Sequence, residues 1–312
     1  MWPKYNFQVP EEKRLLYIIH TDCKNEADDQ YTVAHCLMTD KLEVEGIIAC
    51  HFELNGGRYP EGESVKASEE EIHKILDYMH LQGQYPVLLG SGIPMPDEKT
   101  PVDSEGARFI IRQAMKDDPR PLYIGMQGAI TDLASAILME PEICKKVIAI
   151  WIGGGGYPDG ESEFNLSQDI HAANVVFKSD MELWQVPKPV YKQFAVSLAE
   201  LQLKVRPYGK IGRYLFEQMV EFNMERKDIP HWPHGEIWAL GDEGTIAALM
   251  CEPTRTDMYD MINPPTFAPD MVYIYGNNPS NRKIRVYRTM DARLDLEDLF
   301  AKLQINFPKE DS

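Results

Sequence analysis

Residues 15–29, LLYIIHTDCKNEADD, decide the fold that we predict for this chain. The run Leu15–Ile19 is short, apolar and rich in β-favouring residues, so it predicts a buried parallel strand. The acidic residues that follow therefore lie at the carboxyl end of a strand. Open α/β sheets build their ligand sites at this end, so the stretch also predicts where a site is found.

The segment after the strand is unusually acidic, with Asp22, Glu26, Asp28 and Asp29 inside eight residues. Such crowding of like charges is costly unless a cation or solvent relieves it. Donors that are all oxygen favour calcium or magnesium over zinc. The alternative is a solvated acidic loop that caps the next helix, because acids are favoured at helix N-termini.

Apolar strands and amphipathic helices alternate along the first half of the chain, and this order is typical of an α/β fold. We predict a mainly parallel, doubly wound (Rossmann-like) sheet within one domain, residues 1–312, and a helical portion that covers its active edge. The expected strands are 15–19, 44–50, 86–90, 121–126, 146–152, 271–275 and 284–287, the last two joined by a turn at 276–281. The expected helices are 31–38, one from Ser68 to Met79, 107–115, 131–139 and 172–177 capped by Asp169, then a mainly helical region, 195–262, with helices at 211–223 and 242–251.

The composition bounds the class of protein. The chain has 312 residues, 44% of them hydrophobic, and a formal charge of −17. This charge repels a phosphate backbone, so we expect no nucleic-acid partner. No apolar run is long enough for a membrane span or signal peptide, so we expect a cytoplasmic protein with no membrane partner. The five cysteines are scattered and never form a CxxC pair, which argues against a disulfide framework or a zinc site.

A glycine run and a short polar motif follow the predicted strand 146–152. Gly153–Gly156 does not open a helix directly, so it is a weak dinucleotide signal; close backbone approach to a small ligand and a flexible turn are the two remaining interpretations. Glu163 and Asn165 flank Phe164. A carboxylate and an amide supply well-directed hydrogen bonds to the hydroxyls of a sugar.

These motifs, in this order, resemble the inosine-uridine nucleoside hydrolase family from about residue 15 to residue 251. The family has an Asp-x-Asp-x-Gly-x-Asp-Asp signature after its first strand, and it binds one calcium ion. The resemblance implies the nucleoside hydrolase fold, with metal ligands Asp22, Asp29, the main-chain carbonyl of Met126, and Asp242. It implies substrate contacts at Asp28, Ile152, Glu163 and Asn165, and it makes Asp22 the catalytic base.

The implied activity is calcium-dependent hydrolysis of the N-glycosidic bond of a ribonucleoside by direct attack of metal-bound water, which predicts inversion. The partner is then a small nucleoside or related sugar. A non-catalytic nucleoside or sugar binder is the first alternative. Hydrolysis of another glycoside or of a phosphorylated sugar is the second, and Lys24 and Arg58 leave the phosphate question open. A homo-oligomer is expected from base rates alone.

The sequence also departs from the family pattern. His20 replaces the first aspartate of the signature, the acidic loop is two residues longer, and Gly241 replaces a histidine near the leaving base. His234 could substitute for that histidine, because its ordinary pKa near 6.5 suits proton transfer; simple exposure in a Pro-rich loop is the alternative. Trp232 and Trp238 could stack on a base or cover the core.

Overall fold

A mainly parallel sheet forms the centre of the molecule in the computed structural model, which describes residues 3–53, 58–230, 232–233, 235–250 and 254–310. The eight-stranded sheet has the order β3-β2-β1-β4-β5-β6-β12-β9. All neighbours pair in parallel except β12 and β9, so β9 is an antiparallel edge strand. The strands are β1 (Leu15–Thr21), β2 (Leu42–Ala49), β3 (Val87–Leu89), β4 (Leu122–Met126), β5 (Val147–Ile152), β6 (Glu182–Val186), β9 (Tyr259–Ile262) and β12 (Ile284–Tyr287).

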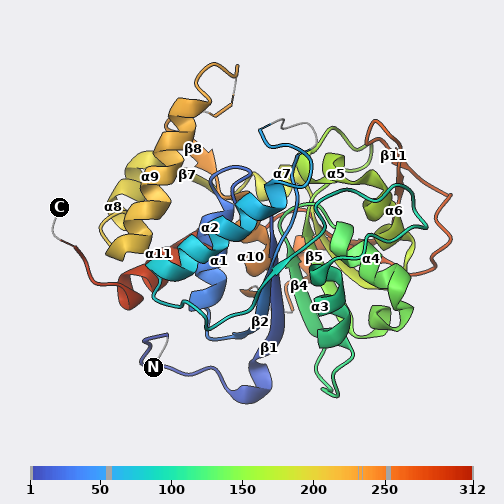
Figure 1. Cartoon of the computed structure of the whole chain (residues 1–312), viewed down its shortest axis with the longest axis horizontal. Helices are drawn as coiled ribbons and strands as arrows, with labels where there is room; N and C mark the ends of the chain where they lie inside the picture. Colours follow the sequence, from blue (N-terminus) through green and yellow to red (C-terminus); the bar gives the residue numbers. More distant parts are fainter. Residues whose placement is uncertain (1–2, 54–57, 231, 234, 251–253, 311–312) are drawn as a thin grey trace.

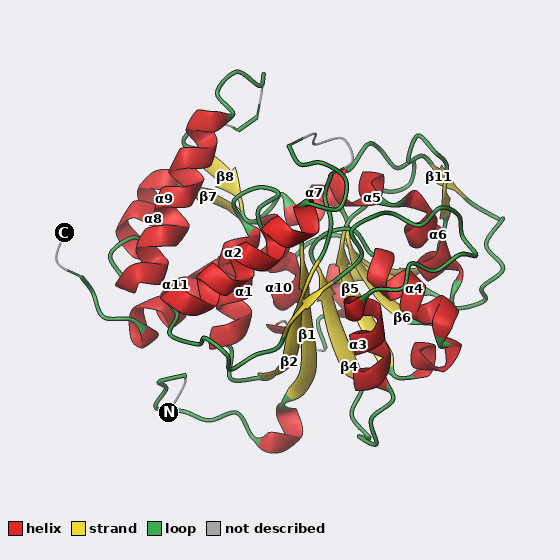
Figure 2. Cartoon of the chain, in the orientation of Figure 1, coloured by secondary structure: helices red, strands yellow, loops and turns green. Residues whose placement is uncertain are grey.

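Helices cover both faces of this sheet (Figures 1 and 2). Side chains alternate between the faces of a strand, so Tyr17 and Ile19 of β1 join one buried cluster and Leu16 and Ile18 the other. The first cluster includes α1 (Asp29–Met38), α2 (Ser64–Tyr78), α10 (Gly244–Met250) and α11 (Ala292–Asn306). The second includes α3 (Glu105–Ala114), α4 (Thr131–Met139) and α6 (Ile170–Lys178). The predicted doubly wound α/β fold is therefore confirmed.

The strand order reverses at β1, which lies between β2 and β4. At such a switch point the connections leave the sheet toward opposite faces, and a crevice opens between them. The loops that follow β1 and β4 lie side by side there, since the Gln127 amide donates to the His20 carbonyl over 2.8 Å. The acidic loop thus lies at the position that the fold reserves for ligands.

The predicted helical region, 195–262, contains strands as well as helices. Its α-helices are α8 (Leu198–Lys204), α9 (Gly209–Glu225) and α10, and its 3-10 turns are η3 (Gly241–Glu243), just before α10, and η4 (Thr256–Met258). Strand β7 (Ala195–Ser197), which precedes α8, pairs antiparallel with β8 (Ile237–Ala239), which lies between α9 and η3. These elements project from the sheet at the upper left of Figure 1. The strands were missed because each has only three residues, too few to show a period.

The C-terminal part differs most from the sequence-based expectation. The predicted strands 271–275 and 284–287 do not pair with each other: β11 (Tyr273–Ile274) pairs with β10 (Thr266–Phe267), whereas β12 enters the main sheet. Helix α11 and strand β6 were not predicted, and α2 begins at Ser64 rather than after Ser68. The remaining elements are η1 (Glu11–Lys13), η2 (Pro141–Lys145), η4 (Thr256–Met258), α5 (Phe164–Gln168) and α7 (Lys188–Tyr191). Within the described ranges, no helix has the length and apolarity that a membrane crossing requires.

Candidate active site

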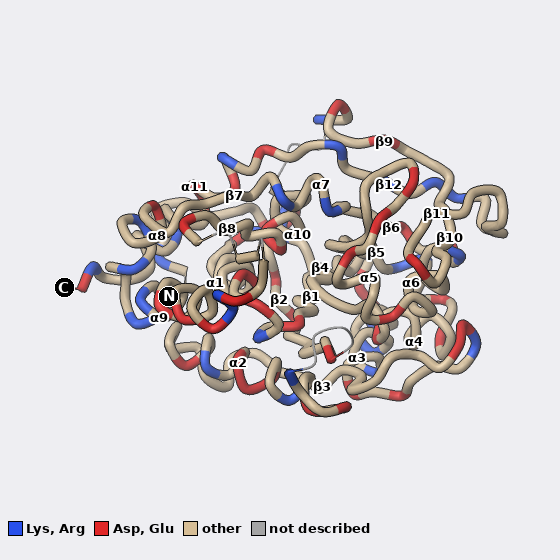
Figure 3. The backbone as a smooth tube through the Cα atoms, turned by 90° about the horizontal axis from the view of Figure 1, so that it is seen from above, with Lys and Arg blue, Asp and Glu red and all other residues tan. Residues whose placement is uncertain are grey.

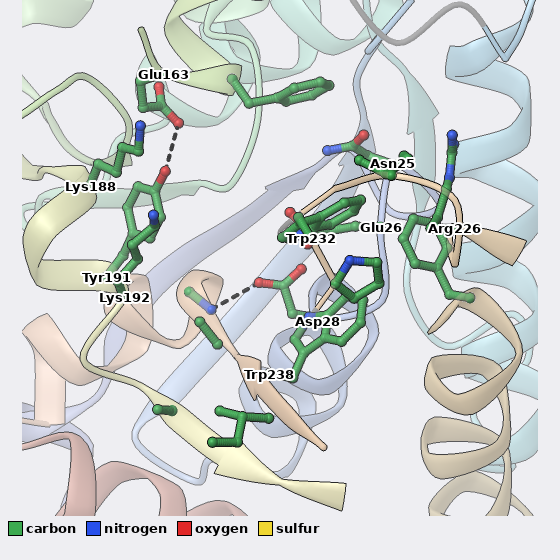
Figure 4. Close-up of a pocket in the computed structure, with 18 of the residues that line it drawn as sticks. Asn25, Glu26, Asp28, Glu163, Lys188, Tyr191, Lys192, Arg226, Trp232 and Trp238 are labelled. Carbon is green, nitrogen blue, oxygen red and sulfur yellow. Dashed lines mark hydrogen bonds between the residues drawn. The ribbon is translucent and has the colours of Figure 1, made fainter. Parts of the chain in front are cut away.

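A cavity of about 620 Å³ opens beside the acidic loop (Figure 4). This volume is in the range of small-molecule sites, ~300–1,000 Å³. Six parts of the chain supply its lining: the acidic loop, Phe52 and Arg58 after β2, residues 162–164, the region of α7, helix α9 with the residues just after it, and residues 232–241. Of the residues predicted for the site, Asp28, Glu163, Trp232 and Trp238 line this cavity.

Three aspartates meet next to the cavity. Asp28 and Asp29 begin α1, Asp242 lies in η3, and one carboxylate oxygen from each lies within 4.8 Å of the others. All three are at most 5% exposed. The Gly241 amide donates to Asp28 Oδ2 over 2.9 Å and Thr21 Oγ1 donates to Asp29 Oδ1 over 2.5 Å, so both carboxylates are held in place. The structure therefore brings Asp242 to the acidic loop, and its role as a metal ligand stays a prediction.

The electrostatics of the cluster are unfavourable without a cation. Burial raises the pKa of Asp22, Asp28 and Asp242 well above the ordinary value, and repulsion from neighbouring carboxylates raises it further. Burial also raises the pKa of Asp29, to about 6, although hydrogen bonds oppose the rise. Carboxylates taken from water cannot all ionise side by side, so the folded chain forms a site that a positive charge would stabilise.

The donor atoms fit a hard divalent cation. Asp22 Oδ2 and Asp28 Oδ1 are buried and receive no hydrogen bond from any described residue. Buried oxygens without partners are costly, and calcium or magnesium would bind them through oxygen alone. Met126 ends β4 and is the register partner of His20, so its residue lies at the same edge of the sheet as the acids.

The loop after β4 packs directly on Asp22. A Cβ atom placed on Gly128 would lie 2.8 Å from Asp22 Cγ and 2.7 Å from Cys50 Sγ. Any larger residue would displace the aspartate, so only glycine fits at this position. This contact could not be predicted from the sequence, because it joins two loops that follow different strands.

Glu163 has a structural role beside the expected sugar-binding one. It is the N-cap of α5: its carboxylate accepts from the amides of Asn165 and Leu166, from the Gly154 amide over 2.9 Å and from Tyr191 Oη over 3.0 Å. These donors fix the orientation of a carboxylate that faces the cavity, which is how a preorganised ligand contact is built.

Asn165 and Ile152 lie behind the cavity lining. The Asn165 amide group donates to the carbonyls of Gln127, over 3.0 Å, and Ile152, over 2.9 Å, so its side-chain oxygen is the atom left for a ligand. Ile152 ends β5 and is 2% exposed, and its Cδ1 lies 2.9 Å from the position of a Cβ on Gly244. The Asn165 side chain therefore ties the ends of β4 and β5 together next to the aspartates.

Tyr191 occupies the space in front of Gly241. A Cβ atom on Gly241 would lie 3.0 Å from Tyr191 Cδ2, and the same tyrosine donates its hydroxyl to Glu163. Burial and the charge of Glu163 raise the pKa of Tyr191 well above its ordinary value, so the phenol stays protonated. The Tyr191 ring from α7 therefore lies where a side chain at position 241 would begin, a contact that the sequence did not reveal.

Aromatic side chains form the wall of the cavity that faces α9. The rings of Phe222, Trp232 and Trp238 are mutual neighbours, with centroids 5.6 to 5.8 Å apart. Trp238 is buried, whereas Trp232 is partly exposed toward the cavity (Figure 4). The two tryptophans therefore pack together and also line the cavity, and their stacking on a base stays a prediction. His234, the predicted substitute acid, lies outside the described residues.

The glycine run after β5 approaches protein side chains. Cβ atoms on Gly153 and Gly154 would lie 2.2 Å from the Trp151 ring and 2.5 Å from Gln185 Nε2. Neither glycine lines the cavity. These two glycines therefore pack closely against protein side chains, which explains why small residues are required here.

The chain is similar in sequence to known nucleoside hydrolases. The profile of the inosine-uridine preferring nucleoside hydrolase family matches residues 17–295. An enzyme of that name from Leishmania major is 28% identical over 171 residues, which cover 53% of this chain and 54% of the relative. The one from Crithidia fasciculata is 34% identical over 122 residues, which cover 37% and 36%. The chain thus spans about half or less of the length of these relatives.

The fold is also shared with solved structures over nearly the whole chain. A purine-preferring ribonucleoside hydrolase from Gardnerella vaginalis superposes with a TM-score of 0.70 at 17% identity, covering 92% of this chain and 98% of that one. At this identity the likeness concerns the fold alone. The match of the family profile to most of the chain carries the classification, and the chain belongs to the inosine-uridine preferring nucleoside hydrolase family.

Proposed function

We propose that this chain hydrolyses the N-glycosidic bond of a ribonucleoside to give ribose and the free base, with calcium as its metal. The observation that carries the proposal is the meeting of Asp28, Asp29 and Asp242 within 4.8 Å beside a cavity that Glu163 and two tryptophans also line. An oxygen-only metal site, a sugar-binding carboxylate and an aromatic wall are the three parts that a nucleoside requires.

Asp22, Asp29, Asp242 and the Met126 carbonyl would hold the cation, as the family pattern implies. When bound, a hard divalent cation orients the sugar hydroxyls and lowers the pKa of a coordinated water. The raised pKa values of the aspartates support this assignment, because a nearby positive charge favours their ionised forms.

Different side chains would act on the sugar and on the base, the two groups that the glycosidic bond joins. Asp22 would accept the proton of the attacking water, and its Oδ2 receives no hydrogen bond from the described residues that would compete. Asp28, Glu163 and Asn165 would hold the sugar hydroxyls. Trp232 and Trp238 would stack on the departing base, which gives them contact with a delocalised leaving group. A cytoplasmic location and a homo-oligomeric state stay predictions from the sequence.

An assay of sugar release from a panel of purine and pyrimidine nucleosides tests the proposal. We expect hydrolysis in the presence of calcium, and a loss of about 100- to 10,000-fold in kcat for Asp22→Asn, the usual contribution of a positioned general base. Asp97→Asn, an exposed aspartate elsewhere, is the matched control. An unchanged rate in Asp22→Asn would overturn the role of this residue, and nucleoside binding without sugar release would favour the non-catalytic binder.

A further inference from the structure

The cavity carries more positive charge than the chain as a whole. The protein has 32 Lys and Arg residues against 49 Asp and Glu, and acidic and basic residues are interspersed along the backbone (Figure 3). Four cations nevertheless line this one cavity: Arg58, Lys188, Lys192 and Arg226. A neutral nucleoside needs none of them, whereas an anionic ligand approaching a protein of net charge −17 requires local positive charge.

The two lysines share one wall with Glu163 and Tyr191 (Figure 4). Lys188 Nζ donates to the Ser162 carbonyl over 2.8 Å and to Glu161 Oε2 over 3.2 Å, which leaves one of its three hydrogens free. Lys192 is exposed and forms no ion pair with any residue that the structure describes. The ammonium groups of Lys188 and Lys192 therefore offer hydrogen-bond donors to a ligand in the cavity.

The two arginines lie on the aromatic side, where Arg226 is drawn opposite the lysines (Figure 4). The guanidinium carbons of Arg58 and Arg226 lie 5.2 and 5.4 Å from the centroid of the Phe222 ring. Arg58 also donates to the carbonyls of Lys24 and Asn25, so its position is fixed by the acidic loop. These arginines are held on the wall that we assign to the base.

The stereochemistry of a ribonucleoside distinguishes the two walls. The base is attached to C1′ and the 5′ carbon to C4′, and these two atoms flank the ring oxygen, so the two substituents, although on the same face of the ring, project toward opposite ends of the sugar. The 2′ and 3′ hydroxyls leave the remaining edge. If the hydroxyls face the aspartates and the base faces Trp232 and Trp238, the 5′ substituent faces Lys188 and Lys192.

We infer that the preferred substrate class is a nucleoside 5′-phosphate, with its phosphate held by Lys188 and Lys192; this inference rests on the proposed function. In the reaction the C1′–N bond breaks with its electron pair on the base. Water supplies the oxygen that joins C1′ and, through Asp22, the proton that the base finally takes. The phosphate ester is unchanged, so the products are ribose 5-phosphate and the free base.

A comparison of each nucleoside with its own 5′-monophosphate tests the inference. We expect kcat/KM to be about tenfold or more higher for the monophosphate, since one hydrogen bond to a charged group is worth about that factor. In the double variant Lys188→Gln, Lys192→Gln this preference should fall to within about twofold, and it should weaken with added salt in the wild type. Lys283→Gln, an exposed lysine outside the cavity, should keep the full preference.

Binding to Asp22→Asn by calorimetry, with calcium present, separates the inference from the proposed function. Tighter binding of the monophosphate that depends on the two lysines supports the phosphate site. If the wild-type protein nevertheless hydrolyses no nucleoside, that second result refutes only the proposed activity. A wild-type preference for the unphosphorylated nucleoside would overturn the inference and leave the activity standing. So would a phosphate preference that survives in the lysine double variant but is lost in Arg226→Gln.

Discussion

His20 Nε2 lies 2.9 Å from Asp132 Oδ2, and both side chains are fully buried where β1 meets α4. His20 departs from the family signature, which has an aspartate at this position. Asp132 also accepts from the Ser91 amide over 2.8 Å and from Ser104 Oγ over 2.5 Å. Burial alone would raise its pKa, but the hydrogen bond and charge of His20 hold it below the ordinary value. The histidine that replaces the first aspartate of the signature therefore forms a buried pair with Asp132 beneath the acidic loop.

This relationship predicts a specific pattern of stability in a double-mutant cycle. His20→Asp alone places a second carboxylate against Asp132 and should cost about 3–5 kcal/mol in the free energy of unfolding, as for a broken buried pair. Adding Asp132→Asn to His20→Asp replaces the two facing carboxylates with an acid–amide pair, and it should recover most of the lost free energy of unfolding. Urea unfolding of the four proteins gives the coupling energy. Additive effects of the two changes would show that the pair is not coupled.

Calcium should stabilise the folded chain through the aspartate cluster. At a concentration one hundred times its Kd, a ligand of the folded state adds about 2.7 kcal/mol, which raises the melting temperature by several degrees. Asp242→Asn should abolish most of this shift, because it removes one of the three carboxylates that meet within 4.8 Å. Asp97→Asn should keep it. Equal calcium shifts in both variants would place the ion elsewhere.

Gly128→Ala should damage the site without changing any charge. The added methyl group would lie 2.8 Å from Asp22 Cγ and 2.7 Å from Cys50 Sγ, so the Asp22 side chain must move. We expect a cost of about 1–3 kcal/mol in the free energy of unfolding, the usual range for overpacking, together with weaker calcium binding by calorimetry. A stability loss with unchanged calcium affinity would mean that Asp22 keeps its position.

A histidine placed at position 241 should not raise the activity toward nucleosides while Tyr191 is present. Its Cβ would lie 3.0 Å from Tyr191 Cδ2, so the imidazole cannot enter the cavity while the tyrosine ring is there. We expect Gly241→His to lower kcat/KM for nucleosides, and Tyr191→Ala combined with Gly241→His to exceed Tyr191→Ala alone. Rate assays of the three variants decide this. A rise in Gly241→His by itself would contradict the steric argument.

Asp298 should make stability fall in acid. It lies 3.0 Å from His35 Nε2 and pairs with Lys302; burial opposes ionisation, but these partners outweigh it and lower its pKa to about 2. Because the folded pKa is below the unfolded one, the contribution is present above about pH 4 and is lost as the pH falls toward 2. Asp298→Asn should therefore cost about 2 kcal/mol at pH 6 and less than about 1 kcal/mol at pH 2.5.

Urea unfolding at both pH values measures the difference. Asp228→Asn, an exposed aspartate, is the control and should have a small and equal effect at both. A cost for Asp298→Asn that does not change with pH would assign the effect to packing rather than to ionisation.

The parts of the site that could be predicted are those that depend on short, contiguous patterns in the sequence. The strand Leu15–Thr21 follows from a compact apolar run, and the acids after it must lie at the edge of the sheet. Residues 163–165 follow a predicted strand and the glycine run after it, which places Glu163 near the same edge, whereas the helix α5 that they begin was not predicted. The alternation of strands and helices was sufficient for the fold class, because it leaves few ways to cover both faces of a parallel sheet.

Only the tertiary structure shows the contacts between residues that are distant in the chain. It pairs His20 with Asp132, places Tyr191 where Gly241 lacks a side chain, and brings Lys188, Lys192 and Arg226 to one cavity. The short strands β7, β8 and β10 and the polar helix α11 escaped prediction for the same reason. Their stability comes from neighbours distant in the chain, so periodicity within the segment carries little of the information. The sequence alone determined the sheet and its acidic edge; folding determined which charges and rings surround that edge, and hence which substrate we expect there.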